Sequence, residues 1–131
     1  MDARFNYPGT ATAANFGRGL NSAGKAVSDS SLPAATQALV KIRASQINGC
    51  AACTDAHTKD AEHAGERSVR LNLVAVWREA TVFTDAERAA LELTEQGTRI
   101  ADAASGVTDQ PLARILPLVR AAKAACVDGG A

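Results

Sequence analysis

Two cysteines three residues apart, with a histidine four residues after the second, are the residues in this sequence best suited to chemistry. They are Cys50, Cys53 and His57, in the segment QINGCAACTDAH at residues 46–57. If a helix begins near Cys50, a rotation of about 100° per residue brings the three side chains within about 60° of one another. Cys53 and His57 then have the i,i+4 spacing at which helical side chains can touch. His63 falls on the far side of this helix and cannot join them.

This segment favours redox chemistry. At a helix N-terminus, the helix dipole and the free N–H groups stabilise a thiolate and lower its pKa. A neighbouring imidazole can take or relay the thiol proton. The pattern suits attack on a peroxide, in which a thiolate becomes a sulfenic acid and the second thiol converts it to a disulfide. An outside dithiol then reduces the disulfide.

Two other interpretations of the segment remain open. A structural zinc site needs four ligands, and one helix supplies three at most, so the fourth would come from Cys126 or from an acidic residue elsewhere. Alternatively, the cysteines are small buried residues beside a solvated histidine. The break at Asn48-Gly49 places Cys50 at a helix start, which favours the redox interpretation. We therefore expect no metal and no cofactor.

The elements that position these residues are predicted to be helical. The chain has 131 residues, with 47% hydrophobic and only 4% aromatic residues, and alanine is the best helix former. No stretch alternates for long enough to suggest a strand. We predict one all-α domain over residues 1–131, a bundle of about six helices. The predicted helices cover residues 11–28, 34–47, 50–64, 66–80, 84–104 and 111–126.

Local signals support several of these helices. Thr84 and Glu87 have the spacing of a capping box, in which each side chain bonds the other residue's backbone N–H. A proline at position 117 predicts a kink in the last helix. The side chains that we expect to face inward share helical spacing and are Val69, Leu73, Val76 and Trp77, then Ala90, Leu91, Leu93 and Thr94.

The charge balance bears on partners and location. Lys+Arg and Asp+Glu are both 14, so no basic field predicts binding to nucleic acid or to an anionic membrane. We see no apolar run long enough for a membrane helix and no signal-peptide core in the first 30 residues. We therefore expect a cytoplasmic protein. Three cysteines are also too few for a disulfide scaffold.

Two longer segments add a resemblance. LVKIRASQINGCAACTDAHTKDA (residues 39–61) and WREATVFTDAERAALELTE (residues 77–95) resemble the AhpD-like alkylhydroperoxidases of the carboxymuconolactone decarboxylase family. The resemblance covers about residues 30–103. It implies an all-helical trimer or hexamer that reduces hydrogen peroxide or organic hydroperoxides and is itself reduced by a dithiol-carrying protein or a small thiol. It also implies that Cys53 is peroxidatic, Cys50 is the proton donor and resolving cysteine, and His57 is a proton relay.

The sequence departs from that family pattern in three places. The relay glutamate expected twelve residues before the first cysteine is Ala38, and a histidine that some members have between the cysteines is Ala52. Glu79 is a candidate for the missing carboxylate, although it equally fits a solvated charge at a helix end. After about Ala104 the resemblance stops, which leaves the oligomer interface undefined.

Two alternative functions follow from the same residues. Another branch of the family decarboxylates a muconolactone and needs no cysteine pair, so the presence of the pair favours the peroxidase. A helical redox sensor or assembly module would form the same disulfide without turnover.

Overall fold

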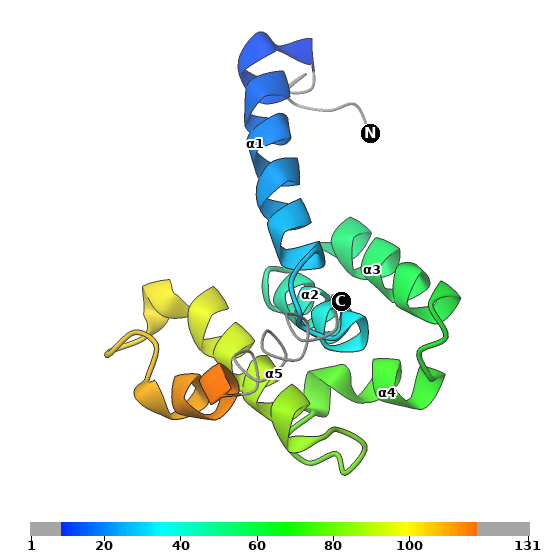
Figure 1. The fold of residues 1–131 in the computed structure, drawn as a ribbon, viewed down its shortest axis with the longest axis vertical. Coiled ribbons are helices and arrows are strands. Elements are labelled where there is room, and N and C mark those ends of the chain that lie inside the picture. Colours follow the sequence, from blue (N-terminus) through cyan, green and yellow to red (C-terminus); the bar gives the residue numbers. More distant parts are fainter. Residues whose placement is uncertain (1–8, 118–131) are drawn as a thin grey trace, which may run out of the picture. The chain divides into compact units, whose positions relative to one another are not determined.

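The computed structural model describes residues 9–117 (Figure 1). The helices in this range are α1 (Ala11–Ser28), α2 (Ala34–Ile47), α3 (Ala51–His63), α4 (Ser68–Leu73) and α5 (Asp85–Thr98), with 3-10 helices η2 (Val74–Val76) and η3 (Ile100–Asp102). Residues 109–117 are also helical, and none of the residues described is in a strand. The prediction of an all-α chain with about six helices is therefore confirmed.

Helix α1 belongs to a compact unit that ends at Ser30, and the remaining helices belong to a second unit that starts at Ser31. The bounds of α1 match the prediction. Thr10 starts the helix, because its hydroxyl accepts a hydrogen bond from the backbone N–H of Ala13 at 3.1 Å. At the other end, Lys25 pairs with Asp29 at 2.8 Å. The prediction of one domain over residues 1–131 is not tested by this division and stays a prediction.

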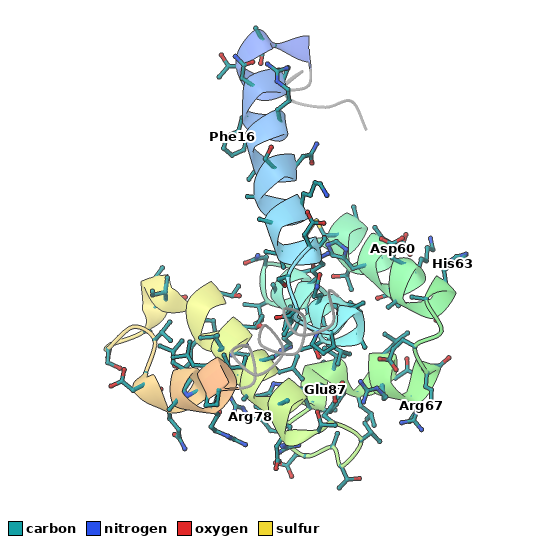
Figure 2. All side chains as sticks on the ribbon, in the orientation of Figure 1. Phe16, Asp60, His63, Arg67, Arg78 and Glu87 are labelled. Atoms are coloured by element: carbon teal, nitrogen blue, oxygen red, sulfur yellow. A yellow bond between two sulfur atoms is a disulfide. The ribbon has the colours of Figure 1, made fainter. Side chains whose placement is uncertain are left out.

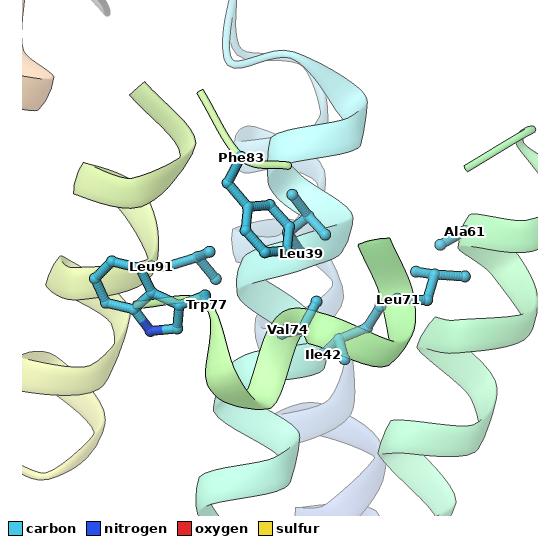
Figure 3. Close-up of a cluster of buried hydrophobic side chains, with 8 residues drawn as sticks. All are labelled: Leu39, Ile42, Ala61, Leu71, Val74, Trp77, Phe83 and Leu91. Atoms are coloured by element: carbon cyan, nitrogen blue, oxygen red, sulfur yellow. The ribbon is translucent and has the colours of Figure 1, made fainter. Parts of the chain in front are cut away.

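Helix α2 is the centre of the second unit and contacts α3, α5 and η2 (Figure 1). Leu39 and Ile42 of α2 are almost completely buried. Burial on several sides requires its polar residues to find partners. The Ser45 hydroxyl donates to the Lys41 carbonyl at 2.7 Å. Figure 3 shows the apolar cluster around this helix, which consists of Leu39, Ile42, Ala61, Leu71, Val74, Trp77, Phe83 and Leu91.

The single helix predicted over residues 66–80 is wrong in extent. The chain forms the short α4, continues as η2 and then turns. In a 3-10 segment, side chains three residues apart lie above one another, and the buried hydrophobic residues here are Leu71, Val74 and Trp77. Two of the residues predicted to face inward, Val69 and Val76, are exposed instead.

The guanidinium of Arg88 explains why the chain turns after η2. It donates hydrogen bonds to the carbonyls of Trp77, Ala80 and Arg78, at distances of 3.0, 2.8 and 2.8 Å. A side chain from α5 therefore satisfies carbonyls that a longer helix would have bonded internally.

Helix α5 opens with the predicted capping box, which is confirmed. The Glu87 N–H donates to the Thr84 hydroxyl at 3.2 Å, and the Thr84 N–H donates to the Glu87 carboxylate at 2.8 Å. The predicted end near residue 104 is wrong, because the α-helix stops at Thr98 and only the short η3 follows. Gly97 and Thr98 are poor helix formers. Ala90 and Leu91 are buried as predicted, and Leu93 and Thr94 are half-buried.

The last predicted helix begins two residues early, at residue 109. Its Pro111 lies in the first turn, where a helix does not need the missing N–H, and is almost completely buried. The kink predicted at Pro117 is not tested, because Pro117 is the last residue that the structure describes. Cys126 lies outside the described residues.

A tight turn joins α2 to α3. Gly49 has a φ of 65°, a left-handed conformation that costs other residues about 1–2 kcal/mol. The Gly49 N–H donates to the Gln46 carbonyl at 3.2 Å, and the Cys50 N–H donates to the Ser45 carbonyl at 3.0 Å. These two bonds form a Schellman motif, which ends α2 and sets the direction in which α3 starts.

A buried carboxylate links three elements of the second unit. Glu95 of α5 is 7% exposed. It accepts hydrogen bonds from Arg43 Nε of α2 at 2.7 Å and from the Trp77 indole N–H at 3.0 Å. Arg78 donates to its other oxygen at 3.0 Å. Burial works to raise the pKa of Glu95, but the hydrogen bonds from Trp77, Arg43 and Arg78 outweigh it and hold the pKa below its usual value.

We predict that Glu95→Gln lowers the free energy of unfolding by about 3 kcal/mol at pH 7, because it leaves Arg43 without its buried partner. The contribution of Glu95 is fully present above the unfolded-state pKa of about 4.3 and is lost as pH falls through the lower folded-state pKa. The difference between the variant and the wild type should therefore shrink near pH 3. Urea denaturation at both pH values measures it. Glu62→Gln on the exposed side of α3 is the control, and equal effects of the two substitutions would contradict this role.

We also predict that Gly49→Ala destabilises the protein by about 1–2 kcal/mol, because alanine must adopt the left-handed conformation. Gly97→Ala is the matched control. Gly97 is helical, and a Cβ there would meet nothing within 4 Å, so this change should stabilise by up to about 1 kcal/mol. Thermal unfolding of the two variants compares them, and a neutral Gly49→Ala would argue against the strained turn.

Candidate functional site

The two cysteines of the motif are joined. Cys50 and Cys53 form a disulfide, with their Cα atoms 5.3 Å apart. Cys50 is the N-cap of α3, and its sulfur accepts a hydrogen bond from the Cys53 N–H at 3.3 Å. The prediction that Cys50 lies at a helix start is therefore confirmed. The N–H groups and positive dipole end of α3 are directed at the sulfur of Cys50, where they favour a thiolate in the reduced protein.

The backbone of Cys50 is held on both sides. Its N–H donates to Ser45 of α2, and its carbonyl accepts bonds from the N–H and the hydroxyl of Thr54 at 2.9 and 3.0 Å. Ser45 and Thr54 were not predicted from the sequence as site residues. The Asn48-Gly49 break was the available signal for Ser45, because a Schellman motif bonds the residue after its glycine to the carbonyl five positions earlier.

The third residue of the motif lies one turn further along α3. His57 is half-buried, whereas Cys53 is exposed. Among the residues that the structure describes, no hydrogen bond or ion pair involves the His57 imidazole. The i,i+4 spacing places it on the same face as Cys53, so a proton could pass between them once the thiols are free.

The other polar residues of α3 are directed to solvent. Asp55 and Asp60 are exposed, and Asp55 pairs with Lys59 at 2.7 Å. His63 is also exposed and donates from Nδ1 to the Lys59 carbonyl at 2.7 Å. Figure 2 shows Asp60 and His63 along the outer side of α3.

An open depression of about 560 Å³ adjoins the disulfide. Cys50 lines it, whereas Cys53 and His57 do not. The other lining residues are small or polar and come from α2, the turn and the first two turns of α3; they are Ser45, Gln46, Gly49, Ala51, Thr54, Asp55 and Thr58. A small molecule or a partner's side chain in this depression would meet the sulfur of Cys50.

The structure also locates two of the departures from the family pattern, Ala38 and Ala52, and the candidate carboxylate Glu79. Ala38 packs against the apolar core and lines a cavity of about 180 Å³ with Ala61 and Ala64. Glu66, which is bonded to Arg70, also lines this cavity, so the walls near Ala38 are mostly alanine with one carboxylate that is already paired. Ala52 is exposed in the first turn of α3. Glu79 is exposed in the turn after η2 and does not line the depression beside Cys50.

Within residues 9–117, no three His, Cys, Asp or Glu side chains come together in a way that could hold a metal ion. In the same range no helix is long and apolar enough to cross a membrane.

Two comparisons with known proteins agree with this geometry. A crystal structure of an Agrobacterium tumefaciens protein, named as a protein of unknown function and a proposed antioxidant defence protein AhpD, matches with a TM-score of 0.75 and 33% identity. The match covers 88% of this chain and 77% of that one. The uncharacterized protein YdfG of Bacillus subtilis (strain 168) is 45% identical over 76 residues, which are 58% of this chain. The chain matches about half the length of YdfG, 52%.

The family model covers the helices that form and support the site. The match runs from residue 14 to residue 96 and so includes the disulfide, His57 and Glu95. With the AhpD-like fold, it shows that the chain belongs to the carboxymuconolactone decarboxylase family.

Proposed function

We propose that this protein is a thiol-dependent peroxidase that reduces hydrogen peroxide or organic hydroperoxides in antioxidant defence. The observation that carries the proposal is the Cys50–Cys53 disulfide at the start of α3, with His57 one turn away. A pair that can close a disulfide without moving the helix is suited to repeated oxidation and reduction. The name of the A. tumefaciens relative, a proposed antioxidant defence protein, supports the same class of function.

In the proposed cycle, Cys53 attacks first because its side chain is exposed to solvent. His57 takes the thiol proton, and the thiolate attacks the O–O bond. The sulfur becomes a sulfenic acid, and the leaving oxygen takes the proton and departs as an alcohol or as water. The peroxide is reduced by two electrons, which Cys53 supplies.

Cys50 then resolves the intermediate. Its sulfur attacks the sulfenic acid sulfur of Cys53, the S–S bond forms, and the hydroxyl leaves as water with the proton from the Cys50 thiol. A dithiol-carrying protein or small thiol reduces the disulfide by two exchange steps and is itself oxidised. The depression beside Cys50 offers this reductant access to one of the two sulfurs. We further propose that the protein acts in the cytoplasm as a homo-oligomer, a trimer or hexamer.

We predict that peroxide consumption with dithiothreitol as reductant falls at least 100-fold in Cys53→Ser, because the attacking sulfur is lost. Cys50→Ser should still react once with peroxide and then stop at the sulfenic acid, which a sulfenic-acid-specific probe detects. Cys126→Ser, which changes the cysteine that is not part of the Cys50–Cys53 motif, is the control and should keep its activity. Equal activity in Cys53→Ser and the wild type would reject this mechanism.

We also predict that His57→Gln slows peroxide consumption by about 100-fold, the lower end of what proton transfer contributes. His63→Gln, on the exposed side of the same helix, should change the rate less than about twofold. Pre-steady-state measurement of thiol oxidation isolates the step. If both histidine variants behave alike, His57 is not the proton relay, and Glu79→Gln then becomes the substitution to measure.

The same variants separate the two alternative functions. A lactone decarboxylase should retain its activity on a muconolactone in Cys53→Ser. A redox sensor should form the disulfide once with peroxide but show no sustained consumption when dithiol is supplied.

A further inference from the structure

A second hollow lies beside α5 and η3, and none of its lining residues belongs to α3. Its volume is about 290 Å³. Its walls carry four charged side chains, together with backbone from the turn after η3; the charged residues are Arg78, Glu95, Arg99 and Asp102. This hollow takes no part in the proposed peroxidase cycle, so its charge needs a separate explanation.

The lining of the hollow holds two arginines and two acidic residues, but arginines outnumber carboxylates among the side chains that meet at Glu95 beside it. The Glu95 carboxylate is paired with Arg43, Arg78 and Arg99, three guanidinium groups for one carboxylate. The nearby Glu92 lies 3.9 Å from Arg78 and 4.0 Å from Arg114, so it adds one further arginine, Arg114, to this group. Four arginines therefore surround two carboxylates.

Two of these arginines have N–H donors that are not used in hydrogen bonds to the described residues. Arg78 and Arg99 are each 52% exposed, and a guanidinium has five N–H donors. Arg78 donates one hydrogen bond to Glu95. Arg99 is 3.6 Å from the same carboxylate, beyond hydrogen-bond distance. Within the described part of the chain no other side-chain hydrogen bond involves either group.

The surroundings hold the Arg78 guanidinium in place. It lies over the Trp77 ring, 4.2 Å from the ring centroid, a cation–π contact that orders the side chain. Asp102 is the acidic group on the exposed wall, and in residues 9–117 it forms no ion pair within 4.0 Å. It therefore does not neutralise Arg78 or Arg99 directly.

We propose that this hollow binds a small oxyanion, a carboxylate or phosphate group, between Arg78 and Arg99. Guanidinium groups bind both kinds of anion through paired N–H···O bonds. Glu95 is hydrogen-bonded to Arg78 but lies 3.6 Å from Arg99, so the N–H donors of Arg99 remain available to a second anion.

The protein carries a built-in reporter for the test. Trp77 is the only tryptophan in the sequence, and it contacts Arg78. Titration of the full-length protein with inorganic phosphate, and separately with succinate, should change the tryptophan fluorescence in a saturable way. Sodium chloride at matched ionic strength corrects for general screening. Saturation by phosphate alone identifies a phosphate site, and saturation by succinate alone identifies a carboxylate site.

Substitutions assign the binding to the hollow. Arg99→Gln should weaken it by roughly 10-fold or more, the effect of a lost charge-assisted hydrogen bond. Arg99→Lys keeps the positive charge and should retain part of the affinity for the anion. If Arg99→Gln lost binding only because it misfolded, the lysine variant would not be expected to recover it. Arg67→Gln is the control, because Arg67 is exposed at the start of α4 and away from the hollow (Figure 2). The proposal is overturned if neither anion gives a saturable change, or if Arg99→Gln binds as tightly as the wild type.

Discussion

The packing of the second unit depends on the buried carboxylate of Glu95. Arg43 reaches it from α2, and Trp77 and Arg78 reach it from the turn that follows η2. A buried carboxylate without these partners would be strongly destabilising. The need to pair the Glu95 carboxylate fixes the register of α5 against α2 and the position of Trp77 in the core. Helix α2 also packs against α3, which carries the cysteines. The Arg43–Glu95 ion pair therefore positions the helix against which α3 packs.

A second set of contacts connects α2 to the cysteines. The Schellman motif at Gly49 ties the N–H of Cys50 to Ser45 in α2, and Thr54 holds the Cys50 carbonyl from within α3. Cys50 is thereby the last bonded residue of one helix end and the cap of the next. A disulfide in this position closes between residues that the backbone already holds together, so oxidation and reduction need no large movement of either helix.

Features determined by neighbouring residues could be predicted from the sequence. The Thr84–Glu87 capping box and the Asn48-Gly49 break depend on residues three or fewer positions apart, and both are present. The helix end after Leu73 could not be predicted, because the Arg88 guanidinium that satisfies the turn comes from a later helix. Glu95 likewise has the spacing of an ordinary helical charge, and its burial depends on Arg43, 52 residues earlier.

In the candidate site, too, local features could be predicted from the sequence, and features that depend on packing could not. The Asn48-Gly49 break predicted the helix start at Cys50, which is confirmed. Helical periodicity placed His63 on the far side of the helix, where the structure has it exposed. The alanine-lined cavity beside Ala38 depends on the packing of α2 against the far end of α3, which periodicity alone does not show. The chemical roles of Cys53, Cys50 and His57 stay predictions, because they concern the reduced protein and its reaction.

The central claim is that peroxide closes the Cys50–Cys53 disulfide through a sulfenic acid. Mass spectrometry of the reduced protein, after one equivalent of peroxide, tests it most directly. The account predicts that the peptide containing both cysteines loses two hydrogens, and that in Cys50→Ser the same peptide gains one oxygen at Cys53. Free thiols at both positions after peroxide treatment would contradict it.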